Sequence, residues 1–282
     1  YLTPINIDPE SPAMPISHPA YYSTYLAKKI GSFATLGLAE DTEAMKEGIT
    51  DDGTFLQQAL DIDDERQEMF FSALSKLRNG SLVCVFDATD RIQHMFWRYI
   101  EKGHPADLGN DDGAHRNAIE ELYIRNDEFV GKILEKVREG DLLCVMSDHG
   151  FTSFRRCVNL NRWLLDEGYL TLKEGATGEA DLLRDIDWSQ TRAYCLGLAG
   201  MFLNIKGREA QGIVEPGDEV RALKGEIISK LKDLRDDEKD EVGINEVFDS
   251  AEIYSGPYVS NAPDFIVGYN AGYRTSWDCA NG

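Results

Sequence analysis

The two stretches that decide the fold are SLVCVFDATDRIQH, residues 81–94, and LLCVMSDHGF, residues 142–151. Each begins with an unbroken apolar run, over residues 82–86 and 142–146. Continuous rather than alternating apolarity is typical of a strand that is buried on both faces, as in a parallel sheet. The sequence between the two runs predicts a helix. We therefore predict a βαβ unit whose two strands are parallel and joined by a right-handed crossover.

Helical periodicity outside these runs predicts the elements that would cover such a sheet. Helices are predicted over residues 21–30, from Phe55 to Leu77, from the loop at residues 109–113 to Gly140, over residues 160–165, and from about Pro216 to Leu234. Later strands are predicted over residues 192–205 and 263–269. Together these patterns predict an α/β fold with a mostly parallel sheet and helices on both faces.

The domain organisation expected from the sequence is a single catalytic α/β domain over residues 1–282. Five of the nine prolines fall within residues 1–20, and proline fixes φ and removes a backbone donor. Residues 1–54 are therefore expected to form an irregular lead-in or cap. Residues 55–282 are expected to form the core that carries the chemistry.

The composition limits the partners of the chain. A net charge of −21 disfavours binding to nucleic acid or to an anionic membrane, since both are negatively charged. This net charge does not exclude a small phosphate-ester substrate, because bound cations can dominate the local electrostatic field. No apolar run reaches the length of a membrane span. The five cysteines include no Cys-x-x-Cys pair, and Cys84 and Cys144 lie in apolar runs, where reduced and buried thiols are expected. This favours a reducing compartment such as the cytoplasm.

Candidate metal ligands follow both predicted strands, where α/β proteins bind their ligands. Asp90 and His94 are four residues apart, so a helix starting after the first strand would present both on one face. Asp148 and His149 are adjacent after the second strand, and their side chains are expected to diverge. Carboxylate oxygen with imidazole nitrogen suits Zn²⁺ or Mn²⁺. Either motif alone is more often a surface pair or a turn, but their shared position at strand ends favours a metal site.

Residues 90–99 followed by 146–151 resemble the alkaline phosphatase superfamily. More narrowly they are similar to the type I phosphodiesterase and nucleotide pyrophosphatase group, and to its branch of predicted phosphohydrolases and phosphomutases. Residues 202–209, 212–217 and 263–269 look like the same branch. The resemblance implies an alkaline-phosphatase-like fold, incomplete at the amino terminus.

The resemblance also implies roles for individual residues. Asp90 and His94 would bind one divalent cation, Zn or Mn, and Asp148 and His149 would bind the other. The family's Thr or Ser nucleophile is expected upstream of Tyr1, so no catalytic nucleophile is assigned within the 282 residues. A further histidine ligand is expected beyond the carboxyl end, because no histidine follows His149.

The function implied for the full-length protein is two-metal hydrolysis of phosphodiester or nucleotide pyrophosphate bonds, through a covalent phospho-enzyme. The 282 residues alone are expected to be nearly inactive. Two alternatives stay open, a phosphomutase of the same superfamily and a non-catalytic metal-binding fragment.

Four other residues near these motifs have more ordinary interpretations. Asp87 is an alternative ligand, but it is expected to support the strand end. Arg91 and Arg98 could bind a substrate phosphate, although a surface role is the commoner one. His115 is expected to cap or begin the long helix.

Overall fold

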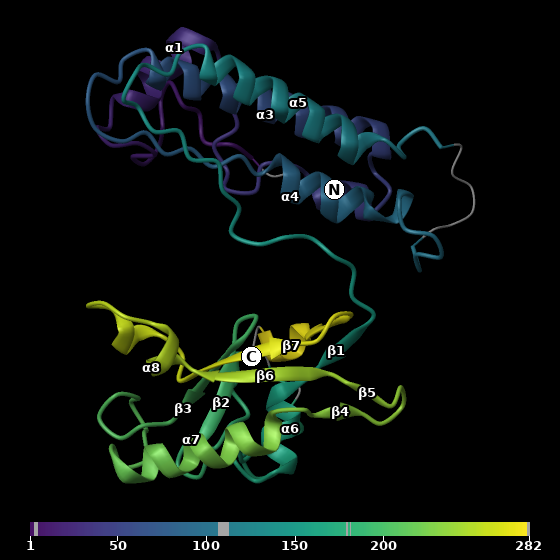
Figure 1. Ribbon diagram of the computed structural model, residues 1–282, viewed down its shortest axis with the longest axis vertical. Helices are drawn as coiled ribbons and strands as arrows, with labels where there is room; N and C mark the ends of the chain where they lie inside the picture. The colour runs from purple at the N-terminus through teal and green to yellow at the C-terminus, as the bar shows by residue number, and fades with distance from the viewer. Residues whose placement is uncertain (3–4, 107–112, 179, 181, 281–282) are drawn as a thin grey trace. The chain divides into compact units, whose positions relative to one another are not determined.

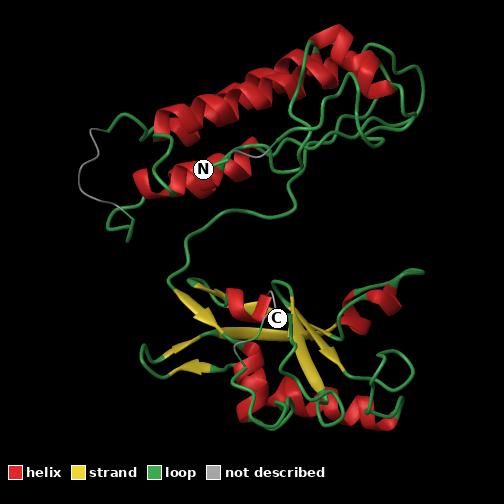
Figure 2. Cartoon of the chain, turned by 180° about the vertical axis from the view of Figure 1, so that it is seen from behind, coloured by secondary structure: helices red, strands yellow, loops and turns green. Residues whose placement is uncertain are grey.

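The computed structural model describes residues 1–2, 5–106, 113–178, 180 and 182–280 (Figure 1). The chain divides into two compact units, Tyr1–Phe151 and Thr152–Gly282. The first unit is helical, and the second combines helices with sheets (Figure 2). The mixture confirms the α/β character expected from the sequence. The prediction that residues 1–282 form a single catalytic domain stays a prediction.

The first unit is built from helices joined by long loops. Its elements are α1 (Tyr22–Ile30), α2 (Thr42–Lys46), α3 (Asp52–Leu74), α4 (Ala88–Phe96), the 3₁₀ turn η1 (Trp97–Tyr99) and α5 (Ala118–Leu134). Three of the helices match the predicted segments in type and position, with α1 ending at Gly31, where φ is +94°. The predicted loop over residues 109–113 lies almost entirely outside the described residues.

The core of the first unit lies between α3, α4 and α5, which run alongside one another in Figure 1. Its centre consists of Phe55, Ile92, Phe96 and Leu122, each at most 1% exposed. A second contact joins α3 to α5, where the rings of Phe70 and Phe129 lie edge to face at 5.5 Å. These contacts fix α4, the helix that carries Asp90 and His94.

The two predicted parallel strands are the main correction to the sequence analysis. Among the described residues, the segments 81–87 and 142–147 form no strand. Their apolar side chains are exposed or half-buried and not fully buried: Val83 is 84% exposed and Leu142 is 94% exposed. A strand buried on both faces needs ladder partners on its edges as well as cover on its faces. Neither segment has a ladder partner in the described chain, so the βαβ unit does not form. Phe86 packs inward, and its ring lies 5.0 Å from the Phe129 ring.

Cysteine alkylation distinguishes the exposed segment from a buried strand. Cys144 lies in the middle of residues 142–147 and is exposed, whereas Cys195 and Cys279 are buried. We expect N-ethylmaleimide to label Cys144 in the native protein at least about tenfold faster than Cys195, because a thiol must be reached by the reagent to react. The measurement is a time course of labelling by peptide mass spectrometry. Protection of Cys144 to the level of Cys195 would indicate that the apolar run is buried as a strand.

The second unit has a small antiparallel sheet as its centre. Its strands are β2 (Ala193–Leu196), β3 (Gly200–Leu203), β6 (Ile244–Asp249) and β7 (Phe265–Tyr269), in the order β2-β3-β7-β6. Two smaller pairs are β1 (Arg156–Val158) with β8 (Tyr273–Thr275), which is parallel, and β4 (Arg235–Asp236) with β5 (Glu241–Val242). The sheet is therefore mostly antiparallel in the described chain, not mostly parallel as expected.

Helices cover this sheet and complete its core. They are α6 (Leu160–Asp166), α7 (Asp218–Leu231), α8 (Ser250–Ile253), the 3₁₀ turn η2 (Val259–Asn261) and α9 (Trp277–Ala280). The predicted helices near residue 160 and after Pro216 are confirmed as α6 and α7. On α7 the buried residues are Leu223, Ile227 and Leu231, spaced by four, and they pack in one cluster with Phe265 of β7. None of the helices that the structure describes is both long and apolar enough to cross a bilayer.

Candidate functional site

The first predicted ligand pair lies on α4, as its four-residue spacing requires. Asp90 is in the first turn of the helix and His94 in the last. The His94 Nε2 atom is 3.4 Å from the Asp90 Oδ1 atom. The side chains are 56% and 31% exposed, so both donor atoms are accessible from solvent.

The second predicted pair lies in the extended segment that ends the first unit. The His149 Nε2 atom is 3.5 Å from the Asp148 Oδ2 atom, so the prediction that these neighbouring side chains diverge is wrong. The reason is a local turn in which the Ser147 hydroxyl donates to the carbonyl oxygen of His149. The His149 ring is held by a 2.8 Å contact between its Nδ1 atom and the carbonyl oxygen of Gly150.

An aromatic contact brings the two pairs into the same region of the first unit. The ring of Phe151 lies 4.8 Å from the ring of His94 and 5.2 Å from that of Trp97. The pKa of His149 is raised, first by the hydrogen bond to Gly150 and then by the carboxylate of Asp148, with a smaller contribution from Asp90. The Asp148–His149 segment therefore lies close enough to α4 for the charge of Asp90 to act on it.

The donor atoms of each pair fit a divalent cation. Ligands about 2.05 Å from a tetrahedral cation are separated from each other by about 3.3 Å, close to the 3.4 and 3.5 Å observed. Since a carbonyl oxygen only accepts, the Nδ1 atom of His149 donates to Gly150. In neutral imidazole this leaves the lone pair on Nε2, the atom beside Asp148.

Within the described ranges, no group of three or more His, Cys, Asp or Glu side chains is arranged to hold a metal. The four-ligand set stays a prediction.

The charged residues around α4 divide into two kinds. Asp87 pairs with Arg66 at 3.0 Å and Arg98 with Asp52 at 2.5 Å, so both take part in ion pairs that hold the helix in place. Arg91 differs, since its Nη1 atom is 3.4 Å from the Asp90 carboxylate. Of the two arginines considered for phosphate binding, Arg91 is the one that lies beside a predicted ligand, Asp90.

Two further residues of the first unit, Glu40 and His115, lie near the charged residues of α4 or its aromatic side chains. The Arg91 Nε atom also lies 3.9 Å from the carboxylate of Glu40, whose side chain is 3% exposed. No local sequence pattern predicts Glu40 as a partner of Arg91, since the two residues are some fifty positions apart. His115 packs against the rings of Phe96 and Tyr99 at 5.5 and 5.4 Å. It neither caps nor begins the long helix as expected, because α5 starts at Ala118 with Asn117 as its N-cap.

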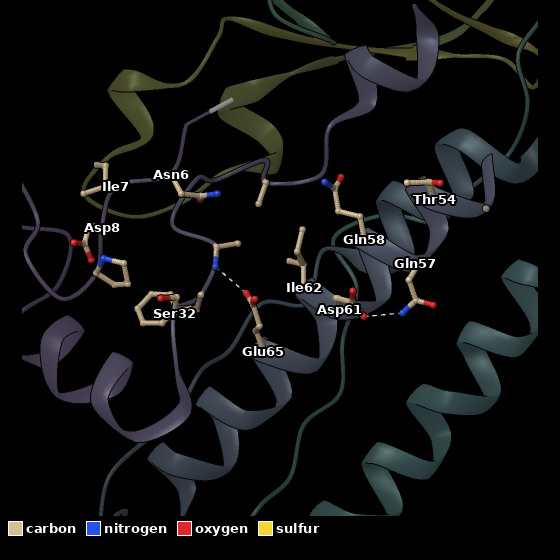
Figure 3. Close-up of a pocket in the computed structure, with 15 residues that line it drawn as sticks. Asn6, Ile7, Asp8, Ser32, Thr54, Gln57, Gln58, Asp61, Ile62 and Glu65 are labelled. Atoms are coloured by element: carbon tan, nitrogen blue, oxygen red, sulfur yellow. Dashed lines mark hydrogen bonds between the residues drawn. The ribbon is translucent and has the colours of Figure 1, made fainter. Parts of the chain in front are cut away.

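A cavity of about 960 Å³ lies elsewhere in the first unit, between the amino-terminal segment and α3 (Figure 3). None of the four predicted ligands lines it. Among the residues that the structure describes, its wall includes the carboxyl groups of Asp8, Asp61 and Glu65 and no Lys or Arg side chain. A negatively charged phosphate ester would be repelled there, so the ligand pairs near α4 are the better candidates for phosphate chemistry.

Comparison with known protein families shows the class of this protein. The sequence profile of the family described as type I phosphodiesterase / nucleotide pyrophosphatase matches residues 14–276. The chain belongs to the type I phosphodiesterase/nucleotide pyrophosphatase family. This family is part of the alkaline phosphatase superfamily, so the resemblance found in the sequence is confirmed. Searches of curated proteins and of solved structures found no match.

Family membership supports hydrolysis of the phosphodiester or pyrophosphate type by this phosphodiesterase-family chain. The family is generally metal-dependent. Both ligand pairs fall within the matched residues, and so do the downstream stretches that carry the resemblance.

Those downstream stretches of the phosphodiesterase-family chain meet in the second unit around a buried ion pair. Asp264 is 6% exposed and accepts two hydrogen bonds from Arg208, at 2.6 and 3.1 Å. It also accepts from the backbone N–H of Leu203 at 2.7 Å. The side-chain amide of Asn204 donates to three backbone carbonyl groups, those of Trp188, Thr191 and Gln211. These residues hold strands and loops of the second unit together.

Proposed function

We propose that this protein hydrolyses phosphodiester or nucleotide pyrophosphate bonds with two divalent cations, Zn²⁺ or Mn²⁺. Asp90 and His94 would hold one cation, and Asp148 and His149 the other. The observation that carries the proposal is the separation of the donor atoms in each pair, 3.4 and 3.5 Å, which matches the spacing of two ligands on one cation. The aromatic contact between Phe151 and His94 supports the placement of both pairs at one site.

The chemistry of the proposed site divides between the cations and the chain. When bound, a pair of divalent cations polarises a phosphoryl group and stabilises the attacking and leaving oxygens of an in-line displacement. The chain contributes ionised carboxylates and neutral imidazoles, and the Gly150 carbonyl fixes the His149 tautomer. Arg91 would orient a non-bridging phosphate oxygen by hydrogen bonds, because its guanidinium lies next to Asp90.

Metal removal tests the proposal directly. We expect dialysis of the longest natural form of the protein against a chelator to lower hydrolysis of bis-p-nitrophenyl phosphate by about 100-fold or more, because metal-site chemistry contributes several kcal/mol to such reactions. Zn²⁺ or Mn²⁺ should restore the rate, and Ca²⁺ should not, since the nitrogen ligands suit the former ions. Elemental analysis of the protein before and after dialysis provides a readout that does not depend on turnover. Full activity in protein that contains no metal would contradict the proposal.

A further inference from the structure

A buried carboxylate of the first unit contacts the proposed site through one arginine. The side chain of Glu40 is 3% exposed, and its Oε2 atom lies 3.9 Å from the Nε atom of Arg91. The Nη1 atom of the same guanidinium lies 3.4 Å from the carboxylate of Asp90, a predicted metal ligand. The charge of Arg91 is therefore shared between a buried carboxylate and a residue of the proposed site.

The backbone that carries Glu40 is fixed by hydrogen bonds. The next residue, Asp41, donates its N–H to the side chain of Gln58 on α3 at 2.8 Å. Asp41 is also the N-cap of α2, since its Oδ1 atom accepts from the N–H of Ala44 at 3.0 Å. The N–H of Thr42 donates to the carbonyl oxygen of Glu40 itself. The Glu40 carboxylate is thus attached to a rigid part of the unit, as a residue that orients another side chain has to be.

The contact between Glu40 and Arg91 is a poor stabilising ion pair. The buried Arg208–Asp264 pair is joined by hydrogen bonds of 2.6 and 3.1 Å. In the described part of the chain no hydrogen bond joins Glu40 to Arg91, and the buried Nε–H group of Arg91 has no hydrogen-bond partner. Burying a carboxylate costs free energy that close, hydrogen-bonded pairing offsets. Stability alone therefore does not account for a carboxylate buried at this place.

The guanidinium of Arg91 keeps donors for a ligand. It carries five N–H groups, and its side chain donates no hydrogen bond within the described residues. The side chain is 21% exposed, so a small anion can reach it from solvent. Attraction by Glu40 also opposes the attraction by Asp90. Without Glu40 the guanidinium would pair more closely with Asp90 and would spend its N–H groups on that carboxylate.

We propose that Glu40 is a positioning residue that holds the Arg91 guanidinium beside Asp90 with its N–H groups directed to a non-bridging oxygen of the substrate phosphate. This inference rests on the proposed function. Arg91 recognises the phosphoryl oxygen, and Glu40 prevents Arg91 from closing onto Asp90. Charge-assisted hydrogen bonds from an arginine to a phosphate are strong and directional, so their loss weakens substrate binding.

The kinetics of Glu40→Gln in the longest natural form of the protein test this role. Glutamine has nearly the shape of glutamate and no charge. With excess Zn²⁺ or Mn²⁺ present, we expect the KM for bis-p-nitrophenyl phosphate to rise about tenfold and kcat to change by less than about threefold. This split is the pattern of an interaction made equally with substrate and transition state. Wild-type KM, or a loss confined to kcat, would overturn the inference.

Glu43→Gln provides the matched control. Glu43 is an exposed carboxylate on α2, three residues from Glu40, and its ion pair with Lys46 lies in solvent. Its replacement should leave the KM within about twofold of the wild-type value, since exposed ion pairs contribute little. An equal rise of KM in Glu43→Gln and Glu40→Gln would show that the effect comes from net charge and not from contact with Arg91.

A double-mutant cycle separates positioning from general support of the fold. Arg91→Met removes the guanidinium, and if Glu40 acts through Arg91, adding Glu40→Gln to this variant should change KM by less than about twofold. A full tenfold effect in both backgrounds would overturn the positioning role. Glu40→Asp is a second variant that keeps the charge, so it tests the role even if Glu40→Gln fails to fold. It draws the carboxylate back by about 1.5 Å, one carbon–carbon bond, and should also raise KM with unchanged circular dichroism.

The outcomes distinguish this inference from the proposed function. Hydrolysis by the metal-loaded wild type, together with wild-type KM in Glu40→Gln and Glu40→Asp, would overturn the role of Glu40 alone. Absence of hydrolysis by the metal-loaded wild type would overturn the proposed function, and this inference with it.

Discussion

Replacing Asp148 or His149 by Ala is expected to lower kcat/KM for bis-p-nitrophenyl phosphate by about 1000-fold or more in the longest natural form of the protein. Each substitution leaves the proposed second cation with half of its ligand pair, and a thousandfold loss corresponds to about 4 kcal/mol of transition-state stabilisation. The same variants should lose roughly one equivalent of bound metal by elemental analysis. Because both side chains are exposed in this structure, the folded state should be retained.

His104→Ala provides the matched control for these variants. His104 is a loop histidine of the same unit, and its Nδ1 atom only accepts a hydrogen bond from the backbone N–H of Ala106. Its replacement should change kcat/KM by less than about threefold, since surface changes away from a site have small effects. Wild-type turnover by Asp148→Ala or His149→Ala would show that the metal assignment is wrong.

Replacing Asp264 by Ala is expected to lower the free energy of unfolding of the second unit by about 2–3 kcal/mol, because it removes the buried carboxylate that accepts two hydrogen bonds from Arg208. The Arg208 guanidinium itself is partly exposed and keeps its contacts with Glu209 and the Leu203 carbonyl. The substitution also removes the acceptor for the backbone N–H of Leu203. The measurement is urea-induced unfolding followed by tryptophan fluorescence. Trp163 and Trp188 pack against the core of this unit, so their emission reports its unfolding.

The exposed ion pair between Arg162 and Asp166 offers a control of the same charge type. Its Nη2 and Oδ1 atoms are 2.9 Å apart, but the side chains are 68% and 55% exposed. Asp166→Ala should cost less than about 0.5 kcal/mol, as exposed pairs generally do. Equal losses in Asp264→Ala and Asp166→Ala would mean that burial of the Arg208–Asp264 pair adds nothing to stability.

The helices could be predicted from the sequence because their signals are local. Apolar residues spaced by three and four mark the buried face of α7, and Gly31 ends α1 with a positive φ that glycine adopts without strain. The Asp90–His94 pair is predictable for the same reason, since one helical turn brings the two side chains together.

The strands β2, β3 and β7 fall within segments predicted as strands, but their pairing could not be predicted, because strand pairing is not local. The runs at residues 82–86 and 142–146 have the composition of buried strands, but composition does not supply a ladder partner. The contact of Glu40 with Arg91 escapes prediction for the same reason, as does the Arg208–Asp264 pair. The convergence of the two ligand pairs was predicted from parallel strand ends and stays a prediction, and in the structure the segment of residues 148–151 is linked to α4 by the contact of Phe151 with His94.

The position of Phe151 bears on how the protein would take up its metals. Its ring lies against both His94 and Trp97, so moving residues 148–149 away from α4 would expose aromatic surface to water. Apolar packing of this kind is insensitive to ionic strength, unlike attraction between charged side chains. The metal-free protein should therefore keep residues 148–151 packed against α4 in concentrated salt, and this packing would hold the segment in place for the proposed cations.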